Sequence, residues 1–263
     1  MKGRSRHGVQ ADATPTKGVV QRLESSMADG PIHFTLIDPD KTPGKRAGLV
    51  AKEAEALGSF AILLGGSTGI TPSTMGDAAI SIHENCKLPV IIFPQGKESL
   101  TREADGILFM SLMNSRNLGL VIRTQARSSI AVKKLGLEPV PVGYLVVAPG
   151  MKVGEVGEAD SIDRSDIEGA VGYALAAQYF GMRLVYLEAG SGAPSPVPTE
   201  MIRAVKEAAS IRVMVGGGIR TGEDAGRVLD GGADAIVTGT VVEEDGGKAL
   251  APILAEVSRR RAR

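Results

Sequence analysis

The sequence predicts an α/β fold, a (β/α)8 TIM barrel in which the helix after the third strand is missing or reduced. Eight short apolar runs alternate with helical patterns, which is typical of βα units and a parallel sheet. The length of 263 residues suits one such barrel, which usually needs about 250. The last two runs each end in a glycine-bearing turn, which favours a closed barrel over an open doubly wound sheet.

The expected strands are mostly continuous apolar runs, as in strands that are covered on both faces. They are 32–38, 60–66, 89–94, 106–111, 142–149, 183–190, 212–218 and 235–240. Helices are expected between the strands at about 43–57, 72–86, 115–135, 164–180, 198–209, 221–231 and 248–262. A further helix near 18–28 is expected to lie across the bottom of the barrel.

Four residues have side chains suited to cap these helices: Thr42, Thr71, Asp163 and Thr221. A proline follows each of the first two, as is common in a first helical turn. Only eleven residues separate the third strand from the fourth, too few for a full barrel helix and two loops. One flank of the barrel should therefore lack its helix and be covered by another apolar element.

Composition excludes several classes of protein. The formal net charge is zero, so nothing points to nucleic acid, and no apolar run approaches the ~20 residues of a membrane span. The single cysteine, Cys86, permits no intrachain disulfide and fits a reducing compartment, so a cytoplasmic location is expected. Residues 1–17 are polar, lack the apolar stretch of a signal peptide, and are expected to be a disordered extension of one domain, 18–263.

The basic run at 259–263 is interpreted as a helix end that complements the helix dipole. The alternative is transient contact with anionic lipid at a membrane surface.

Glycine-bearing turns follow the last two expected strands. Many barrels hold phosphate at this place through backbone N–H groups, and glycine allows close approach because it has no Cβ. Gly217, Gly218, Gly239 and Thr240 are the predicted donors. The alternative is that they form tight turns without a ligand.

The sixth expected strand ends in YLEAGSG. Glu188 alternates with Tyr186, so both side chains should face the barrel interior near its top. A carboxylate at this place is suited to accept a proton from a substrate hydroxyl, so Glu188 is the predicted general base. The hydroxyls of Tyr186 and Ser191 are expected to orient that substrate. A paired, purely structural Glu188 is the alternative.

Asp38 stands at the carboxyl end of the first expected strand, where catalytic residues of barrels lie. An oxygen ligand without nearby histidine predicts Mg²⁺. Ser67 either completes the metal or phosphate site or caps local backbone. Asp40 is interpreted as a helix-start residue rather than a second ligand, and Asn114 either contacts phosphate or braces a loop. His33, at the start of the first strand, is expected to be structural.

Seven motifs together resemble the prenyltransferase family of geranylgeranylglyceryl and heptaprenylglyceryl phosphate synthases, in its larger, mostly archaeal subgroup. They are, in chain order, HFTLIDPDK, LLGGSTG, FMSLMNS, GYLVVAPG, GMRLVYLEAGSGA, VGGGIRTGEDA and VTGTVVE. The resemblance implies transfer of a geranylgeranyl group from its diphosphate to the 3-hydroxyl of sn-glycerol 1-phosphate, with Mg²⁺. This is the first committed step of archaeal ether-lipid synthesis. A homo-oligomer, either a dimer or a hexamer, is also expected.

The resemblance also implies roles for residues. Asp38 and Ser67 would ligate the metal, while glycerol phosphate would be held by Tyr186, Leu187, Glu188, Ala189, Gly190, Ser191, Gly192, Gly217, Gly218, Gly239 and Thr240. Leu36 stands where bacterial-type relatives have a lysine, which leaves details of the glycerol-phosphate contact open. The prenyl groove should run along the flank without a helix, and it should be aliphatic because aromatic residues make up only 3% of the chain.

Two other functions compete with prenyl transfer. A sugar-phosphate isomerase or aldolase would share the phosphate turns. A Schiff-base aldolase, however, needs an interior lysine, and strands four to eight offer none at their ends. A barrel that only binds a ligand or acts as a scaffold would need neither Asp38 nor Glu188 at its mouth. The sequence therefore favours a prenyltransferase.

Overall fold

Eight parallel strands close into a barrel in chain order, with β8 hydrogen-bonded to β1. The computed structural model describes residues 18–66, 69–245 and 247–262. All eight predicted strands are confirmed, with ends that differ by a few residues. Their bounds are Ile32–Ile37 (β1), Ala61–Leu64 (β2), Val90–Ile92 (β3), Gly106–Leu112 (β4), Glu138–Val146 (β5), Leu184–Glu188 (β6), Arg212–Gly216 (β7) and Ala235–Thr238 (β8).

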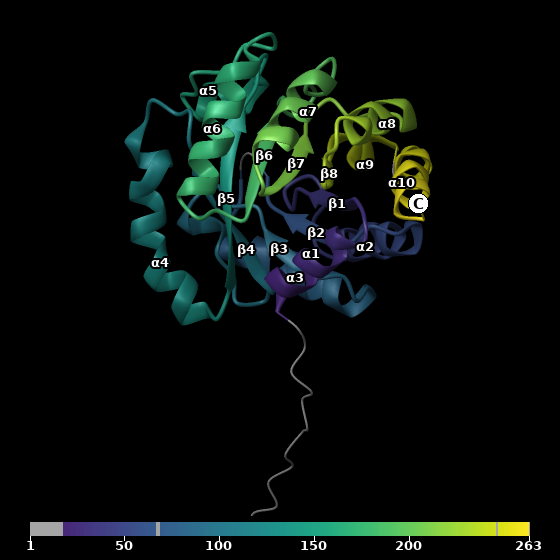
Figure 1. Ribbon diagram of the computed structural model, residues 1–263. Coiled ribbons are helices and arrows are strands. Elements are labelled where there is room, and N and C mark those ends of the chain that lie inside the picture. Colours follow the sequence, from purple (N-terminus) through teal and green to yellow (C-terminus); the bar gives the residue numbers. More distant parts are fainter. Residues whose placement is uncertain (1–17, 67–68, 246, 263) are drawn as a thin grey trace, which may run out of the picture.

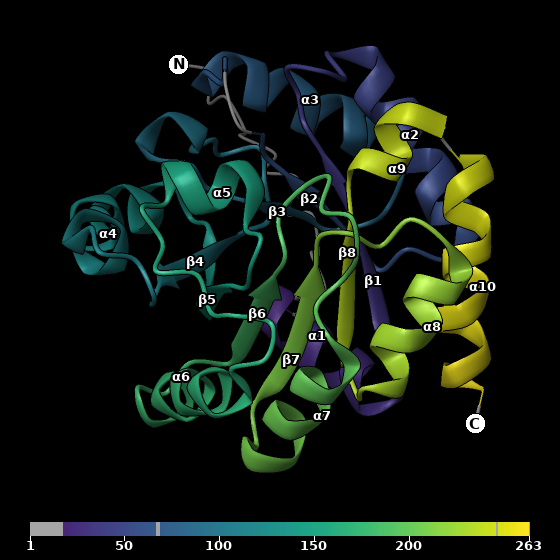
Figure 2. The same ribbon diagram turned by 90° about the horizontal axis from the view of Figure 1, so that it is seen from above.

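Helices surround the barrel (Figures 1 and 2). They are Val19–Ala28 (α1), Lys45–Leu57 (α2), Pro72–Asn85 (α3), Thr124–Leu135 (α4), Met151–Val156 (α5), Ile167–Tyr179 (α6), Thr199–Ala208 (α7), Gly222–Asp230 (α8), Thr240–Asp245 (α9) and Gly247–Arg261 (α10). The short helices α5 and α9 were not predicted. A π-helical turn, Gly119–Arg123 (η2), leads into α4, so the helix expected from residue 115 begins later.

The barrel has an inner and an outer apolar layer. Because side chains alternate along each strand, one set fills the interior and the other packs under the helices. Phe34, Leu63, Leu108 and Tyr186 belong to the inner cluster. Helix α1 adds three buried side chains to the same cluster and lies across the bottom of the barrel, as expected (Figure 2).

The helix between β3 and β4 is missing, as predicted. Only a short 3₁₀ turn, Lys97–Ser99 (η1), stands in its place. Leu100 and Ala104, just after this turn, are buried in the cluster that also contains α2 and α3 side chains. A stretch of loop therefore covers part of the flank that a full barrel helix would occupy.

Two of the four predicted helix caps are confirmed. Thr71 and Thr221 each accept a hydrogen bond from the backbone N–H three residues on, in a reciprocal capping box. The other two predictions are wrong. Gly44 precedes α2 without a side-chain cap, so Thr42 does not cap it, and Asp166 rather than Asp163 caps α6.

The C-terminal arginines are used inside the molecule. Arg260 pairs with Asp230 at 2.6 Å and with Glu256, while Arg259 pairs with Glu256 at 2.6 Å. Arg261 donates to backbone carbonyls between α1 and β1. Arg263 and the expected extension 1–17 lie outside the described residues. The basic run therefore fastens α10 to its neighbours, which weakens the lipid interpretation of this segment.

His33 is buried on β1, with its ring nitrogens 3.0 Å from Ser59 Oγ and 2.9 Å from Thr238 Oγ1. Burial lowers the pKa of His33 to about 3, so the imidazole is neutral at ordinary pH. Its predicted structural role is confirmed.

This buried imidazole should make stability depend on pH. Unfolded histidine takes up a proton near pH 6.5, whereas folded His33 does so only near 3, so the unfolded state binds more protons between these values. The free energy of unfolding should fall as the pH drops through this window, by up to about 1.4 kcal/mol per pH unit. Denaturant titrations at several pH values give the free energy of unfolding of wild type and His33→Gln. This free energy should fall less steeply with decreasing pH in the variant than in wild type. Equal slopes would show that the folded imidazole titrates normally.

Candidate active site

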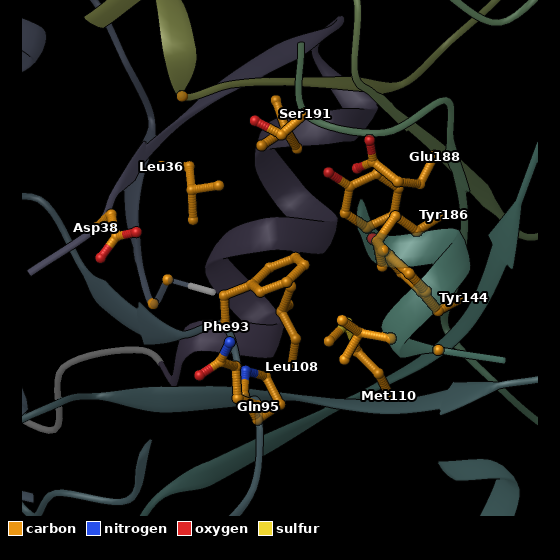
Figure 3. A pocket seen from close by; sticks show the side chains of 18 of the residues that line it. Leu36, Asp38, Phe93, Gln95, Leu108, Met110, Tyr144, Tyr186, Glu188 and Ser191 are labelled. Atoms are coloured by element: carbon orange, nitrogen blue, oxygen red, sulfur yellow. The ribbon is translucent and has the colours of Figure 1, made fainter. Parts of the chain in front are cut away.

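A cavity of about 770 Å³ opens at the carboxyl ends of the strands and extends between β4 and α4. Its polar part is lined by the ends of β1, β6, β7 and β8, and its apolar part by β3, β4, η2 and α4. Figure 3 shows Asp38 and Glu188 on opposite sides, with Leu108 and Met110 along another wall. The cavity therefore joins a polar mouth to an apolar extension.

Glu188 ends β6 with its carboxylate in the interior, 7% exposed. It accepts a hydrogen bond from the Gly190 N–H at 2.7 Å and further bonds from the hydroxyls of Tyr186 and Tyr144. Burial raises the pKa of Glu188 above its usual value, and these three donors oppose the rise because they stabilise the ionised form. The same carboxylate raises the pKa of both tyrosines well above the normal range, after burial itself. The tyrosines therefore stay protonated and donate.

Two glycines make room for this group. A Cβ on Gly216 would lie 2.2 Å from the Tyr186 hydroxyl and 2.9 Å from the Glu188 carboxylate. A Cβ on Gly217 would lie 2.5 Å from the same carboxylate and 2.6 Å from the Gly190 nitrogen, and its φ of 79° already favours glycine. The glycines after β7 are therefore required by the packing around Glu188, whether or not they also face a phosphate.

The loops after β6, β7 and β8 meet on one side of the cavity. Ser191 Oγ lies 3.0 Å from Thr240 Oγ1, which connects the β6 loop to the start of α9. Gly192, Gly217, Gly218 and Gly239 also line the cavity here. Backbone groups of three loops and the N-terminus of a short helix thus converge, which is an arrangement suited to an anion.

An arginine completes this side of the mouth. Arg220 is exposed and lines the cavity, and its guanidinium donates to the Gly192 carbonyl at 3.2 Å. Within the part of the chain that the structure describes, it forms no ion pair with a carboxylate. A guanidinium in this position can bind a phosphate through two parallel hydrogen bonds.

Three residues from the predicted glycerol-phosphate set do not line the cavity. The side chains of Leu187 and Ala189 lie in the outer apolar layer, so only their backbone could reach a substrate. Gly190 acts on the site through its N–H bond to Glu188. The structure brings together the remaining members: Tyr186, Glu188, Ser191, Gly192, Gly217, Gly218, Gly239 and Thr240.

Asp38 follows β1 on the opposite wall. Its side chain is 5% exposed, and one carboxylate oxygen accepts the Asp40 N–H at 3.0 Å. A Cβ on Gly66 would overlap this carboxylate at 2.0 Å, so the glycine leaves it room. Ser67, the second predicted ligand, lies outside the described residues. Asp40 is exposed and does not line the cavity.

The donor set of this wall limits which metal it could hold. Among the described residues, no group of three or more His, Cys, Asp or Glu side chains could surround an ion. Mg²⁺ often binds through one or two carboxylates, with the rest of its shell supplied by water and substrate phosphates. One buried carboxylate at a cavity wall fits that type of site and does not fit a structural zinc site.

Asn114 braces a loop. Its side-chain amide donates to the Val146 and Asp160 carbonyls, both at 2.9 Å, and its carbonyl accepts the Val146 N–H at 3.1 Å. All of its hydrogen-bonding groups are engaged and it is 2% exposed. The structural alternative for this residue is therefore confirmed.

The apolar part follows the flank without a helix, as predicted. Its walls include Ile107 and Leu108 of β4, Leu120 of η2 and Val132 of α4. Its lining is mainly aliphatic, as expected, although Phe93 and Tyr144 also face the cavity and pack edge to face at 6.0 Å. With Tyr186, they place three of the nine aromatic residues of this chain where the polar and apolar parts meet.

Sequence reasoning missed two residues of this site. Tyr144 pairs with Tyr186 in the register of β5 and β6, and their rings pack at 4.9 Å. The motif GYLVVAPG contains it, but only the strand register shows that its hydroxyl reaches Glu188. Arg220 lies in the predicted phosphate motif VGGGIRTGEDA and could have been chosen for its charge.

Comparison with known proteins places these features in context. A model described as the PcrB family matches residues 24–257. Geranylgeranylglyceryl phosphate synthase of Pyrococcus horikoshii is 51% identical over 213 residues, which is 81% of this chain and 84% of the relative. The Thermococcus gammatolerans protein of the same name is 48% identical over 230 residues, 87% of this chain and 91% of the relative.

A crystal structure of (S)-3-O-geranylgeranylglyceryl phosphate synthase from Thermoplasma acidophilum is similar throughout. It is 43% identical, has a TM-score of 0.90, and the match covers 93% of this chain and 100% of that one. That crystal contains its substrate, sn-glycerol 1-phosphate.

The position of Arg220 predicts a measurable contribution to phosphate binding. Arg220→Met should weaken binding of sn-glycerol 1-phosphate roughly tenfold or more, since a charged hydrogen bond contributes about 1.5–3 kcal/mol. Arg203→Met, on an exposed part of α7 outside the cavity, serves as the control. Calorimetric titration measures both, and unchanged affinity in Arg220→Met would remove this residue from the site.

Proposed function

The chain belongs to the PcrB family, and from that premise we propose that it joins a geranylgeranyl group to the 3-hydroxyl of sn-glycerol 1-phosphate. The observation that carries this proposal is the single cavity that combines an anion-binding mouth with an apolar extension. A sugar-phosphate isomerase or aldolase would have no use for the apolar part. The product contains an ether bond, so the reaction belongs to ether-lipid synthesis.

Glycerol phosphate is assigned to the side of the mouth formed by the loops after β6, β7 and β8. The phosphate would lie against backbone N–H groups near Gly239 and Thr240 and beside the Arg220 guanidinium. Support comes from the convergence of these groups and from the Thermoplasma acidophilum relative, whose crystal structure contains this ligand. The glycerol end then points toward Glu188.

The prenyl chain is assigned to the apolar extension along β4 and α4. At roughly 25 cal/mol per Å², burial of several hundred Å² of a C20 chain would supply a large share of its affinity. The diphosphate would then lie near Asp38, on the other side of the mouth from Glu188 (Figure 3).

Mg²⁺ is the proposed metal, held by Asp38 and, by family resemblance, Ser67. When bound, it supplies positive charge that stabilises the departing diphosphate. One buried carboxylate beside a glycine supports this assignment, because substrate oxygens can complete the shell.

In the proposed reaction, the glycerol 3-hydroxyl oxygen forms a bond to C1 of the prenyl group. The bond between C1 and the diphosphate oxygen breaks, and the diphosphate leaves with the electron pair. The hydroxyl proton passes to the Glu188 carboxylate, whose ionised form is held by Tyr144, Tyr186 and the Gly190 N–H. The two walls of the cavity supply alignment, which lowers the entropic part of the barrier.

The proposed location is the cytoplasm. Its support is limited to the one cysteine, Cys86, which is buried and unpaired, as is usual in a reducing compartment. Within the described residues no helix is both long and apolar enough to cross a membrane.

The assignment is tested by incubating the protein with prenyl diphosphates of several lengths and each glycerol phosphate enantiomer. We expect geranylgeranylglyceryl phosphate and diphosphate, identified by mass, from the sn-1 isomer when magnesium is present. Chelation of magnesium should stop product formation. Asp38→Asn should do the same while leaving glycerol-phosphate affinity unchanged, because the carboxylate lies on the other wall. Equal rates with both enantiomers, or full activity of Asp38→Asn, would contradict the assignment.

The base assignment predicts a particular pH dependence. Glu188 must be ionised to accept the proton and burial raises its pKa, so kcat should fall as the pH drops through that raised value. Tyr144→Phe removes a hydrogen bond that lowers the pKa of Glu188. The fall of kcat at low pH, the acid limb of its pH profile, should therefore move to higher pH. Glu188→Gln should reduce kcat about 10²- to 10⁴-fold and abolish the acid limb, with prenyl diphosphate affinity nearly unchanged.

The comparison between the two variants makes this prediction specific. A general loss of structure would lower kcat at every pH and leave the position of the limb unchanged. Normal turnover by Glu188→Gln would assign proton removal to water or to the departing diphosphate.

A further inference from the structure

The helix beside the apolar extension is attached loosely to the barrel. Among the residues of η2 and α4, only Val132 is buried. The inner face lines the cavity with Leu120, Thr124, Gln125, Ser128 and Val132, so much of the surface that would normally seat the helix faces empty volume. Figures 1 and 2 show α4 at the outer edge of the molecule, beside β4 and β5.

The outer side of this helix carries exposed apolar side chains. Leu118, Ile122 and Ile130 are exposed at 49%, 53% and 67% of their surface. Ile122 and Ile130 are eight residues apart and so lie on the same side of the helix, while Leu118 stands just before η2. None of the three lines the cavity. These exposed apolar side chains are therefore not explained by the cavity.

The same helix carries only positive charge. Residues 106–137 contain no Asp or Glu, and their five basic side chains, all exposed, are Arg116, Arg123, Arg127, Lys133 and Lys134. No ion pair joins any of these five to a carboxylate among the described residues. Glu158 approaches this segment, and its carboxylate accepts a hydrogen bond from the Asn117 side chain at 2.7 Å. The positive charge is concentrated on α4 and on the residues just before it.

We propose that this α4 face, made of Leu118, Ile122 and Ile130 with the five basic residues, docks on the surface of an anionic lipid bilayer. A helix with an apolar stripe and flanking cations lies in the plane of such a surface, with the stripe among the acyl chains and the cations at the headgroups. The proposal rests on the proposed function, since it identifies the bilayer as the source of the prenyl diphosphate and the acceptor of the product.

Continuity with the cavity supports a lipid partner. The inner face of the docking helix is a wall of the apolar extension, and the cavity is also lined by Val153 and Val156 of α5, across from η2. Val156 is 67% exposed and Met151 is 38% exposed, so α5 adds apolar surface to this rim beside the charged Lys152 and Glu155. A prenyl chain could then pass from the bilayer into the cavity without crossing water.

A second copy of the chain fits this surface less well. Pairing of the α4 face with itself would bring two sets of five unpaired cations together without carboxylates of the same segment to compensate them. Like charges in such an arrangement repel. Anionic headgroups remove this repulsion and add attraction.

Vesicle flotation tests the proposal. Wild-type protein without substrates should float with vesicles of phosphatidylcholine and phosphatidylglycerol in equal amounts and much less with phosphatidylcholine alone. Arg127→Glu/Ile130→Ser should partition onto anionic vesicles at least roughly tenfold more weakly, since it reverses one charge and removes the most exposed of the three apolar side chains of the α4 face. Added salt should weaken the wild-type interaction.

Leu49→Ser/Lys52→Glu on α2 is the matched control. It removes an apolar side chain that is 62% exposed and reverses one exposed charge at the same spacing, on another side of the barrel. It should float like wild type. Absence of flotation by wild type, or an equal loss in both double variants, would overturn the proposal.

Two further readouts separate this proposal from its alternatives. With a prenyl diphosphate short enough to stay in solution, Arg127→Glu/Ile130→Ser should form product at the wild-type rate, whereas its rate with vesicle-embedded geranylgeranyl diphosphate should fall. If wild-type protein floats with anionic vesicles but forms no product, the proposed function is refuted and lipid docking is not. Conversion of an oligomer to monomers by the same double variant, in light scattering, would identify the α4 face as a protein interface and refute lipid docking.

Discussion

The buried carboxylate of Glu188 constrains much of the surrounding structure. An ionised carboxylate loses several kcal/mol of hydration when it leaves water, so it needs donors. Tyr144 and Tyr186 supply two hydroxyls from adjacent strands, and the turn after β6 supplies the Gly190 N–H. Space for this group exists only because Gly216, which ends β7, and Gly217, which follows it, lack a Cβ. Three strands are thus fitted around one acidic group, in a layer of the barrel where apolar side chains are the rule.

The tyrosines that hold this carboxylate also separate the two parts of the cavity. Their rings pack against each other and against Phe93, and they place polar atoms toward Glu188 and ring carbons toward β4. The missing helix after β3 then leaves α4 as a wall of the apolar part. The gap in the barrel and the apolar part of the cavity thus lie on the same flank.

The strand pattern and the glycine-bearing turns allowed the fold and much of the polar mouth of the cavity to be predicted. Helix caps were predicted less well, because α2 begins after Gly44 without a side-chain cap, and the Asp163 carboxylate is used by Ser165, so that Asp166 caps α6 instead. Tyr144 was missed since its role depends on strand register, which joins residues far apart in the sequence. Motif membership placed Leu187 and Ala189 in the site, but strand alternation directs their side chains outward.

The most direct test is to measure the protonation of Glu188 itself. Infrared difference spectra of wild type against Glu188→Gln, recorded as the pH is lowered, isolate the carboxyl band of this residue. The account predicts that Glu188 of the substrate-free protein titrates above its usual pKa of 4.5, and higher still in Tyr144→Phe. Titration at or below the usual value, or no response to loss of the Tyr144 hydroxyl, would contradict the arrangement on which the rest of the account depends.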